Sequence, residues 1–202
     1  MHNRRWLFTL GAIVVALLVL SGVHPHERST WWMEVAPIFI VAPILALTAR
    51  RFPLTSMLYV LIACHAVILL VGGAYTYARV PLGFWAQDAF HLSRNPYDKL
   101  GHFAQGFVPA LAAREVFIRQ GIVRKGVWTS LLAISIALSV SLIYELIEWG
   151  AAVAMGQGAD AFLGTQGDPW DTQSDMGMAF IGAVVAMAIC VRWQDRQIAA
   201  LR

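Results

Sequence analysis

Long runs of apolar residues, separated by short polar segments, make up most of this chain. A membrane-spanning helix needs about 20 predominantly apolar residues, and the runs predict about six such helices. The pattern therefore predicts an all-α fold, a polytopic transmembrane helix bundle in which residues 1–202 form a single integral membrane domain. The expected helices cover residues 6–21, 31–47, 54–73, 97–118, 127–155 and 172–192.

The composition agrees with this pattern. The chain is 58% hydrophobic and 13% charged, whereas a soluble domain carries about 25% charged residues. Six spans use nearly the whole length, so a separate soluble domain is not expected. The net charge of +3 does not indicate nucleic-acid binding, because excess arginine in a membrane protein marks the cytoplasmic loops.

Lysine and arginine are distributed unevenly between the two sides of the predicted bundle. With the N-terminus inside, eleven of the fifteen fall on the cytoplasmic side and four on the outer side. Positive residues concentrate in cytoplasmic loops, so both termini are predicted to be cytoplasmic. The outer four are Arg28, Arg79, Arg94 and Lys99.

Acidic residues show the opposite bias. Six of the chain's twelve lie within residues 144–175, a stretch without lysine or arginine. Carboxylates held so close to lipid are costly and are functional by default. The six are Glu145, Glu148, Asp160, Asp168, Asp171 and Asp175.

Helix periodicity predicts that polar side chains from three helices meet. Asp98 and His102 are four residues apart at the start of the helix over residues 97–118, so they share one face. Glu145 and Glu148 lie near the outer end of the next helix, and Asp171 and Asp175 open the last one. All three sets fall at about the same outer depth.

Carboxylates gathered this closely would repel one another unless a cation offset their charge. One histidine with several carboxylates suits a divalent metal such as Mg²⁺, Mn²⁺, Ca²⁺ or Zn²⁺. Asp98 or His102 is a candidate general base, and Lys99 a candidate contact for a phosphate. The predicted ligands are His102, Glu145, Glu148, Asp171 and Asp175.

The segment over residues 74–96 is rich in aromatic residues and is expected to lie on the membrane surface. The sequence leaves open whether residues 81–95 form a lid, an interfacial helix or a strap. Tyr75, Tyr77 and Arg79 are candidate contacts for a lipid phosphate, although tyrosine belts are normal at this depth. Asp168 is a further candidate for substrate contact, and a turn before the last helix would explain it equally well.

Four motifs resemble the YjdF-like bacterial inner-membrane proteins over about residues 65–191. They are NPYDKLGHFAQGF, REVFIR, YELIEW and TQGDPWDTQSDMGMAFIGA. More loosely, the chain is similar to VanZ-like proteins, which are associated with glycopeptide-antibiotic tolerance; the shared positions include Asp98, Lys99, His102 and Phe103. The resemblance implies a bacterial inner membrane, multi-pass topology and one shared polar site, and it implies no particular reaction.

Three functions remain open at this point. The first is a metal-dependent hydrolase or transferase acting on a lipid or lipid-linked phosphate at the outer leaflet. The second is a protein that binds or transports a cation or solute. The third is a structural membrane protein whose polar network performs no chemistry. Membrane lipids are the expected partners, nucleic acid is not, and the oligomeric state is left open.

Overall fold

The structure is a computed structural model that describes residues 5–155 and 165–201. Within these residues it contains seven α-helices and one short 3-10 helix. The helices are α1 (Arg5–Val23), α2 (Arg28–Thr48), α3 (Ser56–Tyr75), the 3-10 helix η1 (Tyr77–Arg79), α4 (Pro81–Ala89), α5 (Tyr97–Arg119), α6 (Val127–Met155) and α8 (Asp171–Ala200). The all-α prediction is therefore confirmed.

Five of these helices are long and apolar enough to cross a membrane: α1, α2, α3, α6 and α8. The sixth predicted span corresponds to α5, which is helical over the expected residues but is too polar to meet the same criterion. Among its residues only Leu100 and Val116 are exposed. A helix surrounded by protein does not need an apolar lipid-facing surface, so α5 can carry charged side chains along its length.

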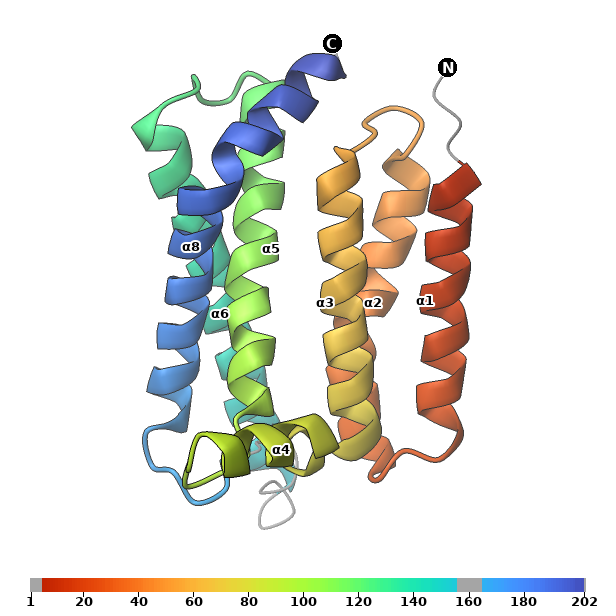
Figure 1. Cartoon of the computed structure of the whole chain (residues 1–202), viewed down its shortest axis with the longest axis vertical. Coiled ribbons are helices and arrows are strands. Elements are labelled where there is room, and N and C mark those ends of the chain that lie inside the picture. The colour runs from red at the N-terminus through yellow and green to blue at the C-terminus, as the bar shows by residue number, and fades with distance from the viewer. Residues whose placement is uncertain (1–4, 156–164, 202) are drawn as a thin grey trace. The chain divides into compact units, whose positions relative to one another are not determined.

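The chain divides into two compact units. The first contains residues 1–54 and 59–97, and the second contains residues 55–58 and 98–202. In the first unit α1, α2 and α3 stand side by side (Figure 1). The buried core is formed by Trp31, Val35 and Ile38 of α2 with Ala66 and Leu70 of α3, and partly buried residues of α1 pack against it.

In the second unit α5, α6 and α8 pack through small residues. Ala110, Ala137 and Ala183 form a buried cluster that joins the three helices. A methyl group added at Gly106 of α5 would lie 1.8 Å from the backbone oxygen of Ala179 in α8, and one added at Gly182 would lie 2.1 Å from that of Phe103. Glycine therefore lets the α5 and α8 backbones touch, as small residues commonly do between membrane helices.

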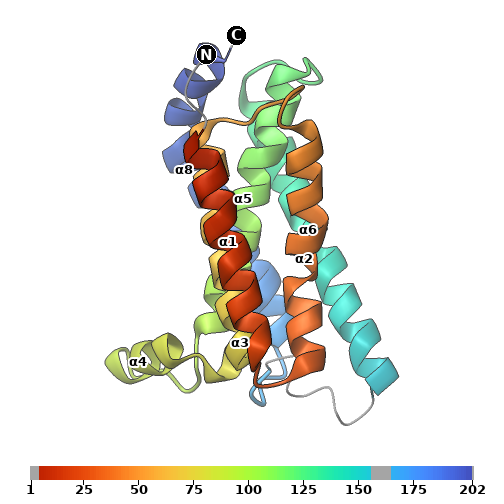
Figure 2. The same ribbon diagram turned by 90° about the vertical axis from the view of Figure 1, so that its right-hand side faces the viewer.

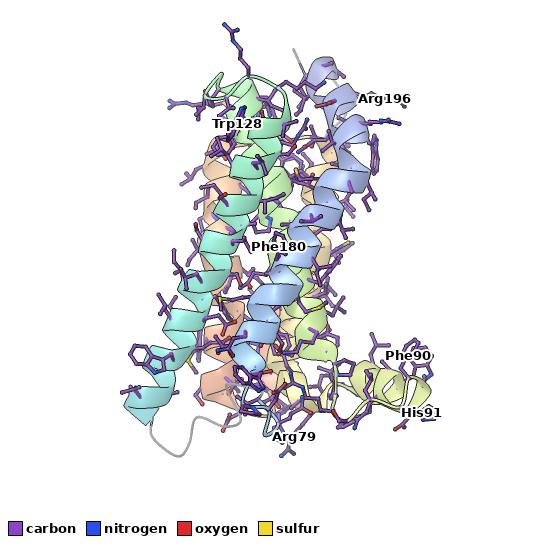
Figure 3. All side chains as sticks on the ribbon, turned by 90° about the vertical axis from the view of Figure 1, so that its left-hand side faces the viewer. Arg79, Phe90, His91, Trp128, Phe180 and Arg196 are labelled. Carbon is purple, nitrogen blue, oxygen red and sulfur yellow. The ribbon has the colours of Figure 1, made fainter. Side chains whose placement is uncertain are left out.

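Helix α8 continues past the predicted end at residue 192 to Ala200. Gln194 and Ile198 are buried in this extension. The apolar run ends near Arg192, but the helix does not, because its last turns are stabilised by packing rather than by lipid. Figure 3 shows Arg196 on this extension, at the same end of the second unit as Trp128 of α6.

Candidate metal centre

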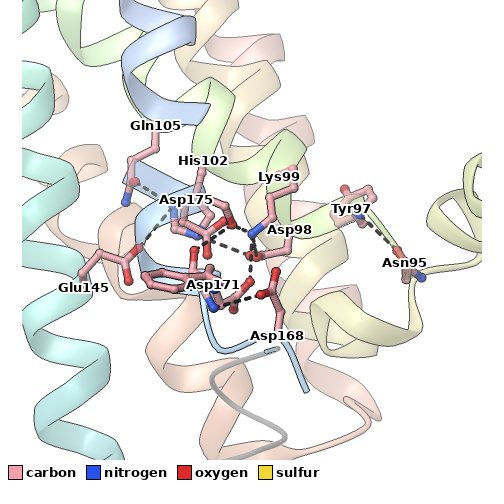
Figure 4. Close-up of polar contacts among 12 residues, drawn as sticks. Asn95, Tyr97, Asp98, Lys99, His102, Gln105, Glu145, Asp168, Asp171 and Asp175 are labelled. Atoms are coloured by element: carbon pink, nitrogen blue, oxygen red, sulfur yellow. Dashed lines mark hydrogen bonds and ion pairs between the residues drawn. The ribbon is translucent and has the colours of Figure 1, made fainter. Parts of the chain in front are cut away.

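The first turns of α5 and α8, together with the later part of α6, bring six charged or titratable side chains into one buried cluster of the second unit (Figure 4). Helix geometry explains the arrangement, because residues four apart on one helix point to the same side. Asp98 and His102 satisfy this spacing on α5, as do Asp171 and Asp175 on α8. Glu145 reaches the cluster from α6.

Asp98, His102 and Asp175 form the part of the cluster that could hold a metal ion. Their ligand atoms all lie within 4.8 Å of one another. His102 Nε2 lies 3.3 Å from Asp98 Oδ1 and 3.7 Å from Asp175 Oδ1. Two ligands bound tetrahedrally at about 2.1 Å from one ion are about 3.4 Å apart, so both distances suit a shared ion.

The other nitrogen of the imidazole is held by Gln105. His102 Nδ1 lies 3.1 Å from Gln105 Oε1, and an amide oxygen can only accept, so Nδ1 carries the proton that is donated. In the neutral imidazole this leaves Nε2, which faces the two aspartates, with its lone pair available. Metal-binding histidines are typically oriented in this way by a partner on the second nitrogen.

Glu145 lies on the same side of the ring as Gln105. Its Oε1 is 3.7 Å from His102 Nδ1, so the imidazole separates it from the two aspartate oxygens at Nε2. Glu145 is therefore placed to orient and charge-balance the histidine rather than to complete the three-residue group.

Lys99 supplies a positive charge at the opposite edge of the cluster. Its Nζ donates to Asp175 Oδ1 at 2.6 Å and to Asp171 Oδ1 at 2.8 Å, and lies 3.7 Å from Asp98 Oδ2. The ammonium thus offsets part of the negative charge. Asp171 belongs to the cluster through Lys99.

The cluster retains a surplus of negative charge. Four carboxylates face one lysine and one histidine. Asp98 and Glu145 are 9% and 5% exposed, and among the described residues Asp98 Oδ2 and Glu145 Oε1 have no hydrogen-bond partner. Buried carboxylate oxygens normally have partners, so Asp98 Oδ2, which belongs to the three-residue group, leaves capacity for a further cation there.

The remaining sequence-predicted residues are not part of the three-residue group. Glu148 is half-buried on α6 and is close enough for its charge to act on His102. Tyr75, Tyr77 and Arg79 belong to the first unit, where Tyr77 is buried against Tyr97 with ring centroids 5.8 Å apart.

Asp168 lies in the loop before α8. Asp168 Oδ1 accepts a hydrogen bond from Trp170 N at 2.9 Å, in a turn closed by a bond from Asp168 N to Thr165 O. The turn suggested by the sequence is therefore present. Asp160 lies outside the described residues.

A second buried polar cluster, at the other end of α5, was not predicted. Arg114 is buried and donates to Gln194 Oε1 at 2.8 Å and to Asp195 Oδ1 at 2.7 Å. Glu115 is fully buried and accepts from Thr55 N at 2.9 Å and from Thr55 Oγ1 at 2.7 Å. The sequence analysis counted Arg114 only among the positive residues of the cytoplasmic side. The signal that could have indicated a buried charge was its position inside a predicted helix, next to an acid.

Comparison with known proteins decides the family. The family described as "Predicted membrane protein (DUF2238)" matches residues 6–196. The chain belongs to this family. It is also 54% identical over 192 residues to the inner membrane protein YjdF of Escherichia coli (strain K12), covering 95% of this chain and 92% of that protein.

The chain is therefore a multi-pass inner-membrane protein of the DUF2238 family, as its resemblance to YjdF-like proteins implied. No solved structure matches the chain. The looser similarity to VanZ-like proteins stays a prediction.

Proposed function

We propose that this protein is a divalent-metal-dependent hydrolase or transferase that acts on a lipid or lipid-linked phosphate at the outer face of the inner membrane. One observation carries the proposal: a histidine nitrogen and two aspartates converge beside a buried carboxylate oxygen that has no hydrogen-bond partner among the described residues. Mixed nitrogen and carboxylate donors suit Mn²⁺ and Zn²⁺, and the carboxylates also suit Mg²⁺.

In this proposal Asp98, His102 and Asp175 hold the ion. A bound divalent ion can activate a water molecule and offset charge on a phosphoryl oxygen. Gln105 and Glu145 orient the imidazole through Nδ1, the ring nitrogen that does not face the two aspartates. Lys99, which pairs with Asp171 and Asp175, would contribute its positive charge to the binding of a phosphate substrate.

A structural role is the second candidate, and the lysine contacts favour it. Lys99 already forms two short ion pairs with the aspartates of α8, which would tie α5 to α8 in the absence of any metal. Under this alternative the cluster is a helix–helix link that needs no ion.

Metal binding by the full-length protein in one detergent separates the two candidates. Isothermal titration with Mn²⁺ and Zn²⁺ is compared for the wild type, Asp175→Asn and His102→Gln, with Asp88→Asn as the matched control because Asp88 is an exposed acid on α4. Loss of an outer-shell partner alone lowers metal affinity about 10–100-fold, so each ligand change is expected to lower it by at least about 100-fold.

The affinity of the wild type is also expected to fall as the pH is lowered, because protons compete with the metal for the histidine and carboxylates. Equal, weak binding by all four proteins would refute the metal site and leave the structural role.

Catalysis needs its own assay. Release of phosphate from lipid phosphates and lipid diphosphates in mixed micelles is measured with the metal that binds. The enzyme proposal predicts turnover that is lost in Asp98→Asn and retained in Asp88→Asn. A protein that binds the metal but releases no phosphate from any of these lipids would contradict the hydrolase, and a transfer assay with a lipid acceptor would then test the transferase.

A further inference from the structure

We infer that α4 is an interfacial anchor that inserts its apolar side chains into the boundary between headgroups and acyl chains of the membrane that α3 crosses. This inference does not depend on the proposed metal site. It rests on where α4 is held in the first unit and on which of its side chains are exposed.

The segment of residues 77–97, which contains α4, is attached to the last turns of α3. Tyr97 Oη, just beyond the segment, donates to Ile68 O at 3.2 Å. Tyr77, Val80 and Tyr97 form a buried cluster against Ile68, Leu69 and Val71 of α3. Ile68 precedes the end of α3 by seven residues, which corresponds to about 10 Å along the helix axis.

The depth of this attachment follows from the length of α3. Its 20 residues span about 30 Å, the thickness of the hydrocarbon core. A segment attached across the last 10 Å of such a span lies at the membrane interface and not in bulk water.

Asn95 holds both ends of the segment together. Its Nδ2 donates to Val80 O and its Oδ1 accepts from Tyr97 N, each at 3.0 Å. Gly83 of α4 packs directly on this side chain, since an added methyl group there would lie 1.7 Å from Asn95 Oδ1. The start of α4 is therefore held in a fixed position by Asn95.

From its start beside Asn95, α4 runs across the axis of α3 and points away from the end of that helix (Figure 2). With nine residues it is far too short to cross a membrane. Large apolar side chains are nevertheless exposed along it and just after it: Leu82, Phe84, Trp85, Phe90 and Leu92. Figure 3 shows Phe90 just beyond the last turn.

Lipid is the partner that these observations favour for the exposed apolar side chains of α4. Leu82 and Trp85 are three residues apart, so they share one face of the helix. Tryptophan and phenylalanine are the side chains that favour the apolar side of an interfacial helix, where they lie about 5–10 Å into the headgroup and acyl boundary. Only the short helix η1 separates α4 along the chain from α3, which is itself a candidate span.

Site-directed spin labelling of the full-length protein in phospholipid vesicles tests the inference. Cys64 and Cys190 are first replaced by alanine, and a nitroxide is attached at Trp85→Cys or, in a second variant, at Leu82→Cys. Accessibility to oxygen, which partitions into lipid, is compared with accessibility to a water-soluble nickel chelate. Exposed positions supply the references: Lys125→Cys for water and Ile136→Cys of α6 for the hydrocarbon core.

The labels at positions 85 and 82 are expected to report a depth about 5–10 Å below the phosphates, between the two references. Nickel accessibility equal to that of the Lys125→Cys label would show that α4 lies in water and would overturn the inference. Low accessibility to both reagents would show that protein covers the helix, and would overturn it equally. If one labelled variant does not fold, the other decides.

Discussion

The two ends of α5 both carry buried charges, but their charges are balanced differently. Near residue 114, the positive side chains are matched by acids and by neutral acceptors, and both oxygens of Glu115 are satisfied. At the other end, four carboxylates face Lys99 and His102, and two carboxylate oxygens lack hydrogen-bond partners among the described residues.

This difference distinguishes a cluster that only joins helices, called the link below, from a cluster that could bind a ligand, called the site. The cluster around Arg114 and Glu115 joins α5, α8 and the start of α3 through hydrogen bonds that are complete at both acids. Arg114 Nε is buried there without a partner among the described residues, but it is a donor on a cation, so it leaves no capacity for a further cation. The cluster around Asp98 and His102 leaves capacity for one more cation. A buried polar group that is fully paired stabilises a unique arrangement, whereas an incompletely paired one is costly unless a ligand completes it.

The largest expected effect is on the link. Arg114→Met leaves Gln194 and Asp195 without their buried donor, and breaking a buried charge pair in this way costs about 3–5 kcal/mol. The free energy of unfolding, measured in mixed micelles, is expected to fall by this amount while metal affinity is unchanged. Arg124→Met, at an exposed arginine, is the control. An unaltered stability in Arg114→Met would remove the distinction drawn between the two ends.

The next effect is on the site. Asp98→Asn is expected to lower metal affinity by at least about 100-fold, which is about 2.7 kcal/mol. Without metal, its free energy of unfolding is expected to stay within about 1 kcal/mol of the wild type, because the change relieves surplus negative charge. Titration calorimetry and unfolding on the same preparations measure both. Strong destabilisation of the metal-free variant would show that the acidic end is a link as well.

Backbone contact between α5 and α8 should couple the site to the packing. Gly106→Ala forces a methyl group against Ala179 O, and such overpacking costs about 1–3 kcal/mol. Because the site takes ligands from both helices, metal affinity should fall too. Gly177→Ala, where the added methyl group meets nothing within 4 Å, is the matched control and should leave melting temperature and affinity unchanged or slightly improved. Equal behaviour of the two variants would contradict this coupling.

The smallest effect on stability is expected at the exposed ion pair beside the Arg114 cluster. Lys125 pairs with Asp195 at 2.6 Å, but its side chain is 58% exposed. Exposed ion pairs contribute about 0–1 kcal/mol and are screened by salt. Lys125→Gln should therefore change the melting temperature little, and less still in high salt. A loss as large as that of Arg114→Met would mean that the link depends on its outer charge.

The apolar pattern was sufficient to predict the helices. Long hydrophobic runs determine where spans form, since every backbone polar group in lipid must be bonded within its own segment. The start of α5 at Tyr97 and that of α6 at Val127 agree with the predicted bounds. Helical spacing also placed Asp98 with His102, and Asp171 with Asp175, on common faces.

Tertiary structure decided which of those faces meet and in what roles. The sequence predicted ligands from all three helices: His102, Glu145, Glu148, Asp171 and Asp175. The geometry groups His102 with Asp175 and also with Asp98, and it puts Glu145 at the other ring nitrogen. It also placed Lys99 between two aspartates and buried Arg114. Spacing along one helix fixes only the direction in which a side chain leaves that helix. Distances between helices depend on close contacts such as Gly106 against Ala179, which hydrophobicity and charge along the chain do not encode.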